Sequence, residues 1–275
     1  MARNDSLDSL AGCIATYLQS WRPGVVSVSP RELSLVLGAV AGLADLVGGA
    51  LVASRRQWDR VFLQYFLALG AGFMLAVAFL RMVPESLEKG SHAYLYVLIG
   101  YFVVHLTEHT LTPHFHFGEE IHHDALVHPA VGYLGLAGLC IHTFFDGVAI
   151  ASGFMVSRSL GFILFAAVLL HKLPEGFAVG SLMLASGASR RAALFASGVL
   201  GLATLAGAVF LTTFTGIVGQ ALALSAGVTI YVAASDLIPE VNKERSWGVA
   251  LAVFGGVLLY YVAESALEAT GLHGH

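Results

Sequence analysis

Charged residues are scarce in this chain of 275 residues, because only 12% of them are Asp, Glu, Lys or Arg. A soluble domain usually carries about 25% charged residues and uses them to cover its surface. Hydrophobic residues make up 57% of the chain, and its mean hydropathy is +0.77. This composition argues against a soluble enzyme or a disordered protein, and it predicts that lipid surrounds most of the side chains.

Cysteine and net basic charge are also low. The two cysteines, Cys13 and Cys140, are too few for a disulfide framework or for a zinc site built from cysteine. The formal net charge of −4 provides no broad basic surface for nucleic acid. We therefore expect neither a nucleic-acid partner nor a cysteine-based metal centre.

Long apolar stretches dominate what remains. The 44 residues 192–235 contain no Asp, Glu, Lys or Arg. A helix crosses the hydrocarbon core with about 20 residues, so this stretch predicts two crossings with a tight turn near Gly216–Gly219. Backbone groups in lipid must bond internally, which favours helices. We expect an all-α integral membrane protein with eight transmembrane helices, near residues 34–53, 61–83, 94–111, 131–156, 159–184, 192–217, 219–239 and 247–268.

Basic residues in the short loops predict the orientation. The loops after spans one, three, five and seven hold seven Lys or Arg residues, and the loops after spans two, four and six hold three. The positive-inside rule places the first set in the cytoplasm and both termini outside a plasma (bacterial inner) membrane. We expect an extracytoplasmic tail at 1–31 without a cleavable signal peptide, a single transmembrane domain at 32–270, and a short tail at 271–275. A His-rich loop at 113–130 would be cytoplasmic.

Two adjacent spans each carry a histidine four residues before a carboxylate. The pairs are His142 with Asp146 and His171 with Glu175. Residues i and i+4 share one face of a helix, so each span offers an imidazole and a carboxylate from the same side. Ionisable groups at membrane depth are costly and are functional candidates by default.

The two segments also align with each other. His142–Ser152 lies over His171–Ser181 with identical His, Gly, Ala and Ser positions, and Asp pairs with Glu. Consecutive spans are antiparallel, so the similarity is an inverted repeat, and transporters often bind substrate where such repeats meet. The four side chains would form a site suited to Zn²⁺ and also to Fe²⁺, Mn²⁺ or Cd²⁺. The plainer alternative is two satisfied interior histidines with each carboxylate paired to a neighbour.

At these residues the chain resembles the ZIP (Zrt-/Irt-like) family of divalent-metal transporters. The family's signature is a pair of His-x-x-Pro-Glu-Gly motifs in the fourth and fifth of eight helices. His171–Gly176 matches in full, and His142–Gly147 matches with Phe for Pro and Asp for Glu. Residues 72–85 and 235–240 look like the family's second and seventh helices. The resemblance covers about residues 34–270.

The resemblance implies uptake of Zn²⁺ or a related cation toward the cytoplasm. It also implies a 3+2+3 inverted-repeat bundle, with the fourth and fifth helices holding the metal. The cation would be the substrate, lipid would surround the protein, and no prosthetic group is expected. Whether the protein forms a homodimer is left open. By position, four residues match the family's primary transport site: His142, Asp146, His171 and Glu175.

Some members of the family hold a second metal beside the first. The matching positions here read Thr143, Lys172 and Gly201, and a protonated lysine cannot ligate a metal. In one interpretation the Lys172 ammonium replaces the second metal and hydrogen-bonds to Asp146 or Glu175, which leaves a mononuclear site. In the other, Lys172 points away and reaches water.

Further polar residues have two interpretations each. Glu108 and His109, and the pair Asp236 and Glu240, either belong to a cation pathway or lie at solvated helix ends. Asp45 stands alone among apolar residues, where it would line a pathway or bond to another helix.

The composition of the His-rich loop suggests metal binding, and the alternative is a solvated loop without a specific ligand role. Its candidate ligands are His114, His116, His122 and His123. Two other functions stay open for the whole protein. An intramembrane metal-dependent hydrolase also needs His and acidic groups within helices, although no His-Glu-x-x-His pair is present. A metal-gated receptor without flux is the third.

Overall fold

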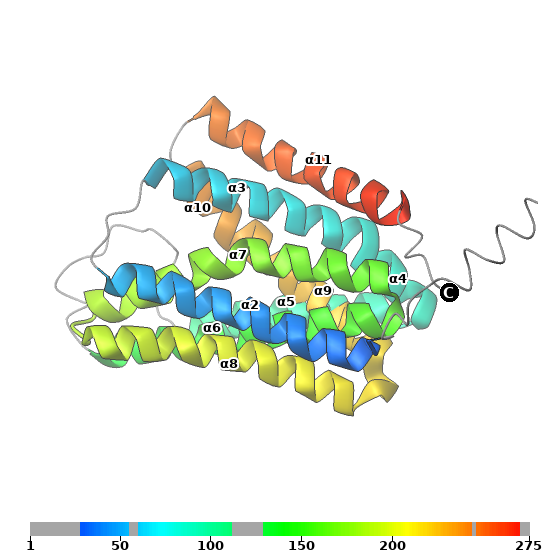
Figure 1. The fold of residues 1–275 in the computed structure, drawn as a ribbon, viewed down its shortest axis with the longest axis horizontal. Coiled ribbons are helices and arrows are strands. Elements are labelled where there is room, and N and C mark those ends of the chain that lie inside the picture. The colour runs from blue at the N-terminus through cyan, green and yellow to red at the C-terminus, as the bar shows by residue number, and fades with distance from the viewer. Residues whose placement is uncertain (1–27, 55–59, 112–128, 244–245, 270–275) are drawn as a thin grey trace, which may run out of the picture.

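The computed structural model describes residues 28–54, 60–111, 129–243 and 246–269. All regular structure in these ranges is helical (Figure 1). The long helices are α2 (Pro30–Ala53), α3 (Arg60–Val77), α5 (Ala93–Leu111), α6 (Pro129–Val156), α7 (Arg158–Ala185), α8 (Arg190–Thr213), α9 (Val218–Tyr231) and α11 (Trp247–Ala269). The short elements are η1 (Ala78–Met82), α4 (Val83–Lys89), η2 (Thr215–Ile217), η3 (Val232–Leu237) and α10 (Ile238–Asn242).

The expected spans coincide with helices, and the turn in the long uncharged stretch is confirmed. The chain leaves α8 after Thr213 and forms a short 3-10 helix before α9 begins at Val218. Seven of the described helical stretches are long and apolar enough to cross a membrane. α5 is not among these seven, because its last turns carry polar residues that lower its hydropathy.

Serine residues fix where several helices begin. Ser29 accepts a hydrogen bond from the backbone N–H of Glu32, whose carboxylate accepts one from the backbone N–H of Ser29, and this capping box precedes Pro30 at the first turn of α2. Ser157 and Ser189 accept bonds from the first turns of α7 and α8 in the same way. Such caps satisfy backbone N–H groups that have no partner inside the helix.

Two of the helices that could cross a membrane contain a π-helical segment. η1 lies just before Pro84, and η3 lies just before Pro239. Proline lacks an N–H and its ring clashes with the carbonyl four residues earlier, so the regular hydrogen-bond ladder cannot continue there. The wider turn absorbs this defect and changes the direction in which nearby side chains point.

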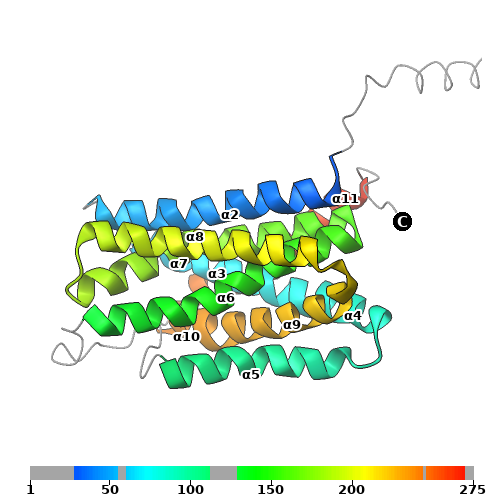
Figure 2. The same cartoon turned by 90° about the horizontal axis from the view of Figure 1, so that it is seen from below.

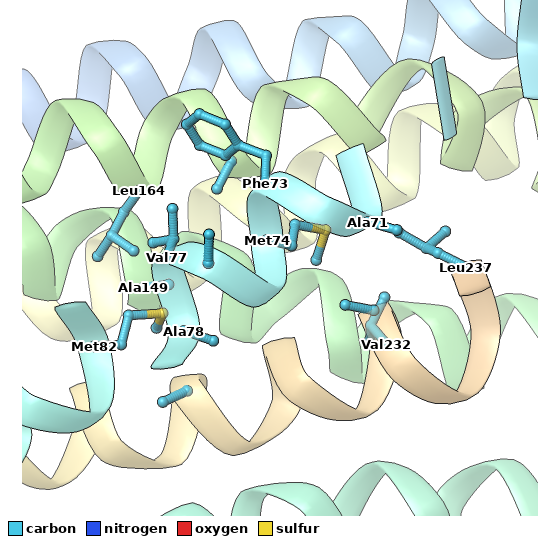
Figure 3. Close-up of a cluster of buried hydrophobic side chains, with 14 of the residues drawn as sticks. Ala71, Phe73, Met74, Val77, Ala78, Met82, Ala149, Leu164, Val232 and Leu237 are labelled. Carbon is cyan, nitrogen blue, oxygen red and sulfur yellow. The ribbon is translucent and has the colours of Figure 1, made fainter. Parts of the chain in front are cut away.

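The helices pack in a paired pattern. α2 packs against α7 and α8, and α6 packs against the same two helices. At two edges of the bundle, α11 lies against α3 and α5 lies against α9 (Figures 1 and 2). The largest apolar core lies where α3 and η1 meet α6, α7 and η3. It contains Phe73, Met74, Leu164 and Val232 (Figure 3). This core supports one side of the α6–α7 pair.

The outer helices expose large apolar side chains. Leu251, Phe254 and Leu258 of α11 are 64%, 72% and 64% exposed, and Leu106 of α5 is 62% exposed. Water would penalise such surfaces, whereas lipid tails accept them. The described chain begins and ends at the same end of the bundle (Figures 1 and 2).

Candidate metal centre

Four of the predicted site residues meet between α6 and α7. Ligand atoms of His142, Asp146, His171 and Glu175 all lie within 4.8 Å of one another. Each of these residues is at most 5% exposed. Two imidazole nitrogens and two carboxylates are a donor set that Zn²⁺ and related divalent cations accept.

The histidine rings face the carboxylate of Asp146. Nε2 of His142 lies 3.1 Å and Nε2 of His171 lies 3.2 Å from Asp146 Oδ2. Nδ1 of His171 lies 3.0 Å from the carbonyl oxygen of Ala167 one turn earlier. A bond from that nitrogen to a backbone carbonyl fixes the ring and leaves the other nitrogen for the site.

Glu175 is bonded on both oxygens. The Thr143 hydroxyl donates to Oε1, and the Lys172 ammonium donates to Oε2 over 2.6 Å. The same ammonium lies 2.7 Å from Oδ2 of Asp146. Lys172 is 0% exposed, so the structure excludes the interpretation in which it reaches water. Its predicted contacts with Asp146 and Glu175 are confirmed.

A third carboxylate lies beside Lys172. Oδ2 of Asp45, on α2, lies 3.7 Å from Lys172 Nζ, and both residues are 0% exposed. Asp45 therefore approaches a residue of another helix at ion-pair distance, in the direction of one of its two interpretations, without forming a hydrogen bond to it. Asp45, Asp146 and Glu175 thus place three carboxyl groups around the one lysine side chain.

The motif glycines allow this close packing. A Cβ on Gly176 would lie 1.9 Å from the carbonyl oxygen of Asp45 on α2. A Cβ on Gly147 would lie 1.8 Å from the carbonyl oxygen of Thr204 on α8. Neither position has room for a side chain, so the backbones of α2 and α7, and of α6 and α8, touch beside the site.

A second repeat underlies these contacts. Residues 42–48 read Gly-Leu-Ala-Asp-Leu-Val-Gly, and residues 201–207 read Gly-Leu-Ala-Thr-Leu-Ala-Gly. Gly42 and Gly201 lie against each other. The α2 segment packs on the α7 motif as the α8 segment packs on the α6 motif. This pattern is a sequence signal that could have linked Asp45 to the site in advance.

The predicted pathway residues separate into two groups. Glu108 lies within hydrogen-bonding reach of Asp236 and Tyr231, so the end of α5 meets η3. His109 is exposed, with its ring 4.1 Å from that of His105. Glu240 pairs instead with Lys243 at 3.1 Å. The loop histidines fall outside the described residues, and they are His114, His116, His122 and His123.

The fold and the site together define a helical, multi-pass membrane protein with a buried group of cation ligands. Comparison with known sequences identifies the family. A model of the family described as ZIP zinc transporter matches residues 29–130 and 118–264. The chain belongs to this family.

Similar proteins are named zinc transporters. Zinc transporter ZupT of Salmonella newport (strain SL254) is 28% identical over 241 residues, which cover 79% of this chain and 92% of the relative. Zinc transporter SLC39A7 of Homo sapiens is 34% identical over 143 residues, or 46% of this chain. Zinc transporter zipt-7.1 of Caenorhabditis briggsae is 26% identical over 242 residues, or 65% of this chain and 62% of the relative. The match covers only 30% of the human relative's length.

Proposed function

We propose that the protein takes up divalent transition-metal cations toward the cytoplasm of a plasma (bacterial inner) membrane. Zn²⁺ is the first candidate, and Fe²⁺, Mn²⁺ and Cd²⁺ suit the same donors. The observation that carries this proposal is the buried group of two histidines and two carboxylates within 4.8 Å. Membership of the ZIP zinc transporter family supports it. The cation is the substrate, and His142, Asp146, His171 and Glu175 would be its ligands during passage.

We infer an eight-span, 3+2+3 arrangement with both termini outside. α5 would be the eighth span, because it has 19 residues and runs along α9 (Figure 2). The pairing of α5 with α9 resembles that of α3 with α11, and a π segment precedes proline in both α3–α4 and α9–α10. The excess of basic residues in the sequence loops after spans one, three, five and seven supports a cytoplasmic position for those loops.

We also propose that the site holds one metal at a time. At the second-metal positions, Thr143 bonds to Glu175 and Lys172 bridges Glu175 and Asp146. Gly201 supplies no ligand, and a Cβ there would lie 2.4 Å from the carbonyl oxygen of Gly42. Crystals soaked in Zn²⁺ or Cd²⁺ should give one strong anomalous peak between α6 and α7, and two adjacent strong peaks would refute a mononuclear site.

Uptake into proteoliposomes tests the transport function. His171→Ala removes one imidazole from the ligand set, so Zn²⁺ and Cd²⁺ uptake should nearly vanish. His92→Ala, which changes an exposed histidine bonded to Ser91, is the matched control and should transport normally. Unchanged flux in His171→Ala would contradict the assignment. Hydrolysis of lipid or peptide without metal flux would favour the hydrolase instead.

We further propose that Glu108 and Asp236 form a step between this site and the cytoplasm. Their proximity, and the position of Asp236 in the π segment η3, support that role. His109 and Glu240 would lie farther along the same exit, with the His-rich loop 113–130 as a cytoplasmic acceptor.

A further inference from the structure

Asp45 is an acidic side chain beside the site that lies outside the four-residue group His142, Asp146, His171 and Glu175. It is 0% exposed, and neither of its carboxylate oxygens accepts a hydrogen bond from the residues that the structure describes. The ammonium of Lys172, at 3.7 Å, is close enough for an ion pair but too far for a hydrogen bond. A buried carboxylate without hydrogen bonds is costly, so its position requires an explanation.

The internal repeat shows that Asp45 and Lys172 belong together. Aligning the α7 motif with the α6 motif sets Lys172 against Thr143. Aligning α2 with α8 sets Asp45 against Thr204, and the glycine contacts confirm that register. One half of the repeat therefore carries a lysine and an aspartate where the other half carries two threonines. Lys172 and Asp45 therefore replace two uncharged threonines together, as a pair of opposite charges.

Lys172 occupies oxygens that a metal ion needs. Its Nζ lies 2.6 Å from Glu175 Oε2 and 2.7 Å from Asp146 Oδ2. A zinc ion binds carboxylate oxygens at about 2.0–2.2 Å. An ammonium and a divalent cation repel each other, so Lys172 and an entering metal compete for these oxygens. At 0% exposure, a displaced ammonium has no direct route to water.

We propose that Asp45 receives the Lys172 ammonium when a divalent cation binds. In the metal-free protein, Lys172 pairs with Asp146 and Glu175. In the metal-bound protein, it moves toward Asp45, so the metal replaces a tethered cation. This inference rests on the proposed function, because it assumes that a divalent cation enters the four-ligand site.

Asp45 then acts as a positioning residue that sets metal affinity without touching the metal. Because the ammonium keeps a counter-charge in both states, neither state leaves an unpaired buried cation. Without Asp45, metal entry would force Lys172 into apolar surroundings.

A double-mutant cycle tests the coupling. Zn²⁺ affinity of the full-length protein in detergent is measured by competition with a chromophoric chelator. The variants are Asp45→Asn, Lys172→Thr and the two combined. Asp45→Asn should weaken Zn²⁺ binding at least tenfold in the wild-type background, and less than threefold when Lys172 is already threonine.

Each outcome has a defined meaning. If Asp45→Asn weakened Zn²⁺ binding equally in both backgrounds, Asp45 would act as a fixed charge or as a ligand, and the proposal would be overturned. Unchanged Zn²⁺ affinity in the wild-type background would overturn it too. A wild-type protein that binds no Zn²⁺ would instead refute the proposed function. Lys172→Met replaces Lys172→Thr if the threonine variant unfolds.

A metal-bound structure gives a second test that needs no variant. With Zn²⁺ at the site, Lys172 Nζ should lie within about 3.2 Å of an Asp45 oxygen and farther from Asp146 and Glu175 than its present 2.7 and 2.6 Å. An ammonium that keeps both short contacts while Zn²⁺ is bound would refute the transfer.

Discussion

Replacing Gly176 by alanine should separate α2 from α7 and damage the site without changing a ligand. The added Cβ would lie 1.9 Å from the carbonyl oxygen of Asp45, whereas ordinary contacts begin at 3.4 Å, so α2 has to retreat by about 1.5 Å. Overpacking of this kind costs about 1–3 kcal/mol. Lengthening the 3.7 Å Lys172–Asp45 separation by the same amount weakens their attraction by about 1 kcal/mol at an effective dielectric constant of about 20.

Thermal unfolding and zinc binding measure the two consequences separately. For a chain of this size, the combined loss of roughly 2–4 kcal/mol corresponds to a Tm lower by roughly 5–15 °C. Scans at one fixed rate in the same detergent keep the comparison valid if unfolding is irreversible. Zn²⁺ affinity should fall as well, because Asp45 moves away from Lys172.

Gly180→Ala is the matched control for this experiment. Gly180 lies one turn after Gly176 on α7 and faces the same helix, but its added Cβ would lie 3.4 Å from Gly49 Cα. This variant should keep the wild-type Tm within about 2 °C and bind Zn²⁺ normally. If Gly176→Ala matched Gly180→Ala in both measurements, the close approach of α2 and α7 would not be what positions Asp45.

Three further predictions follow from the same geometry. Gly147→Ala should destabilise the protein as much as Gly176→Ala, because its Cβ would lie 1.8 Å from a carbonyl oxygen of α8; a wild-type Tm would contradict this. Ser197→Ala removes a bond donated to the Gly176 carbonyl at 3.2 Å and should cost about 1 kcal/mol, measured by the same scans. Zn²⁺ binding should weaken as the pH falls, since protons compete with the metal for histidine and carboxylate ligands, and a flat dependence would contradict a site built from such groups.

Local patterns in the sequence predicted the helices and the four central residues. Hydropathy marked the spans, and the i, i+4 spacing placed each histidine on the same face as its carboxylate. The alignment of the α6 and α7 motifs predicted that both pairs meet, and they lie within 4.8 Å. The Lys172 contacts were one of two interpretations, because the direction of a long side chain depends on its neighbours.

Long-range contacts could not be predicted in the same way. Asp45 and Lys172 are far apart in the chain, and their 3.7 Å contact depends on how closely two helices approach. Glu108 and Asp236 come together because α5 packs beside α9, and Asp236 lies in the π segment η3 that follows α9. Neither hydropathy nor spacing within a single helix specifies which helix lies next to it.

The sequence by itself determined the apolar character of the spans, the helical class and the duplicated His–carboxylate motif, since composition and spacing along one helix decide these. Only the tertiary structure decided that Asp146 and Glu175 both pair with Lys172 and that Asp45 lies beside it. The physical reason is the glycine contacts, because Gly176 and Gly147 let backbones touch where any side chain would hold the helices apart. This close helix packing brings together charged residues of three different helices, namely Asp45, Asp146, Lys172 and Glu175.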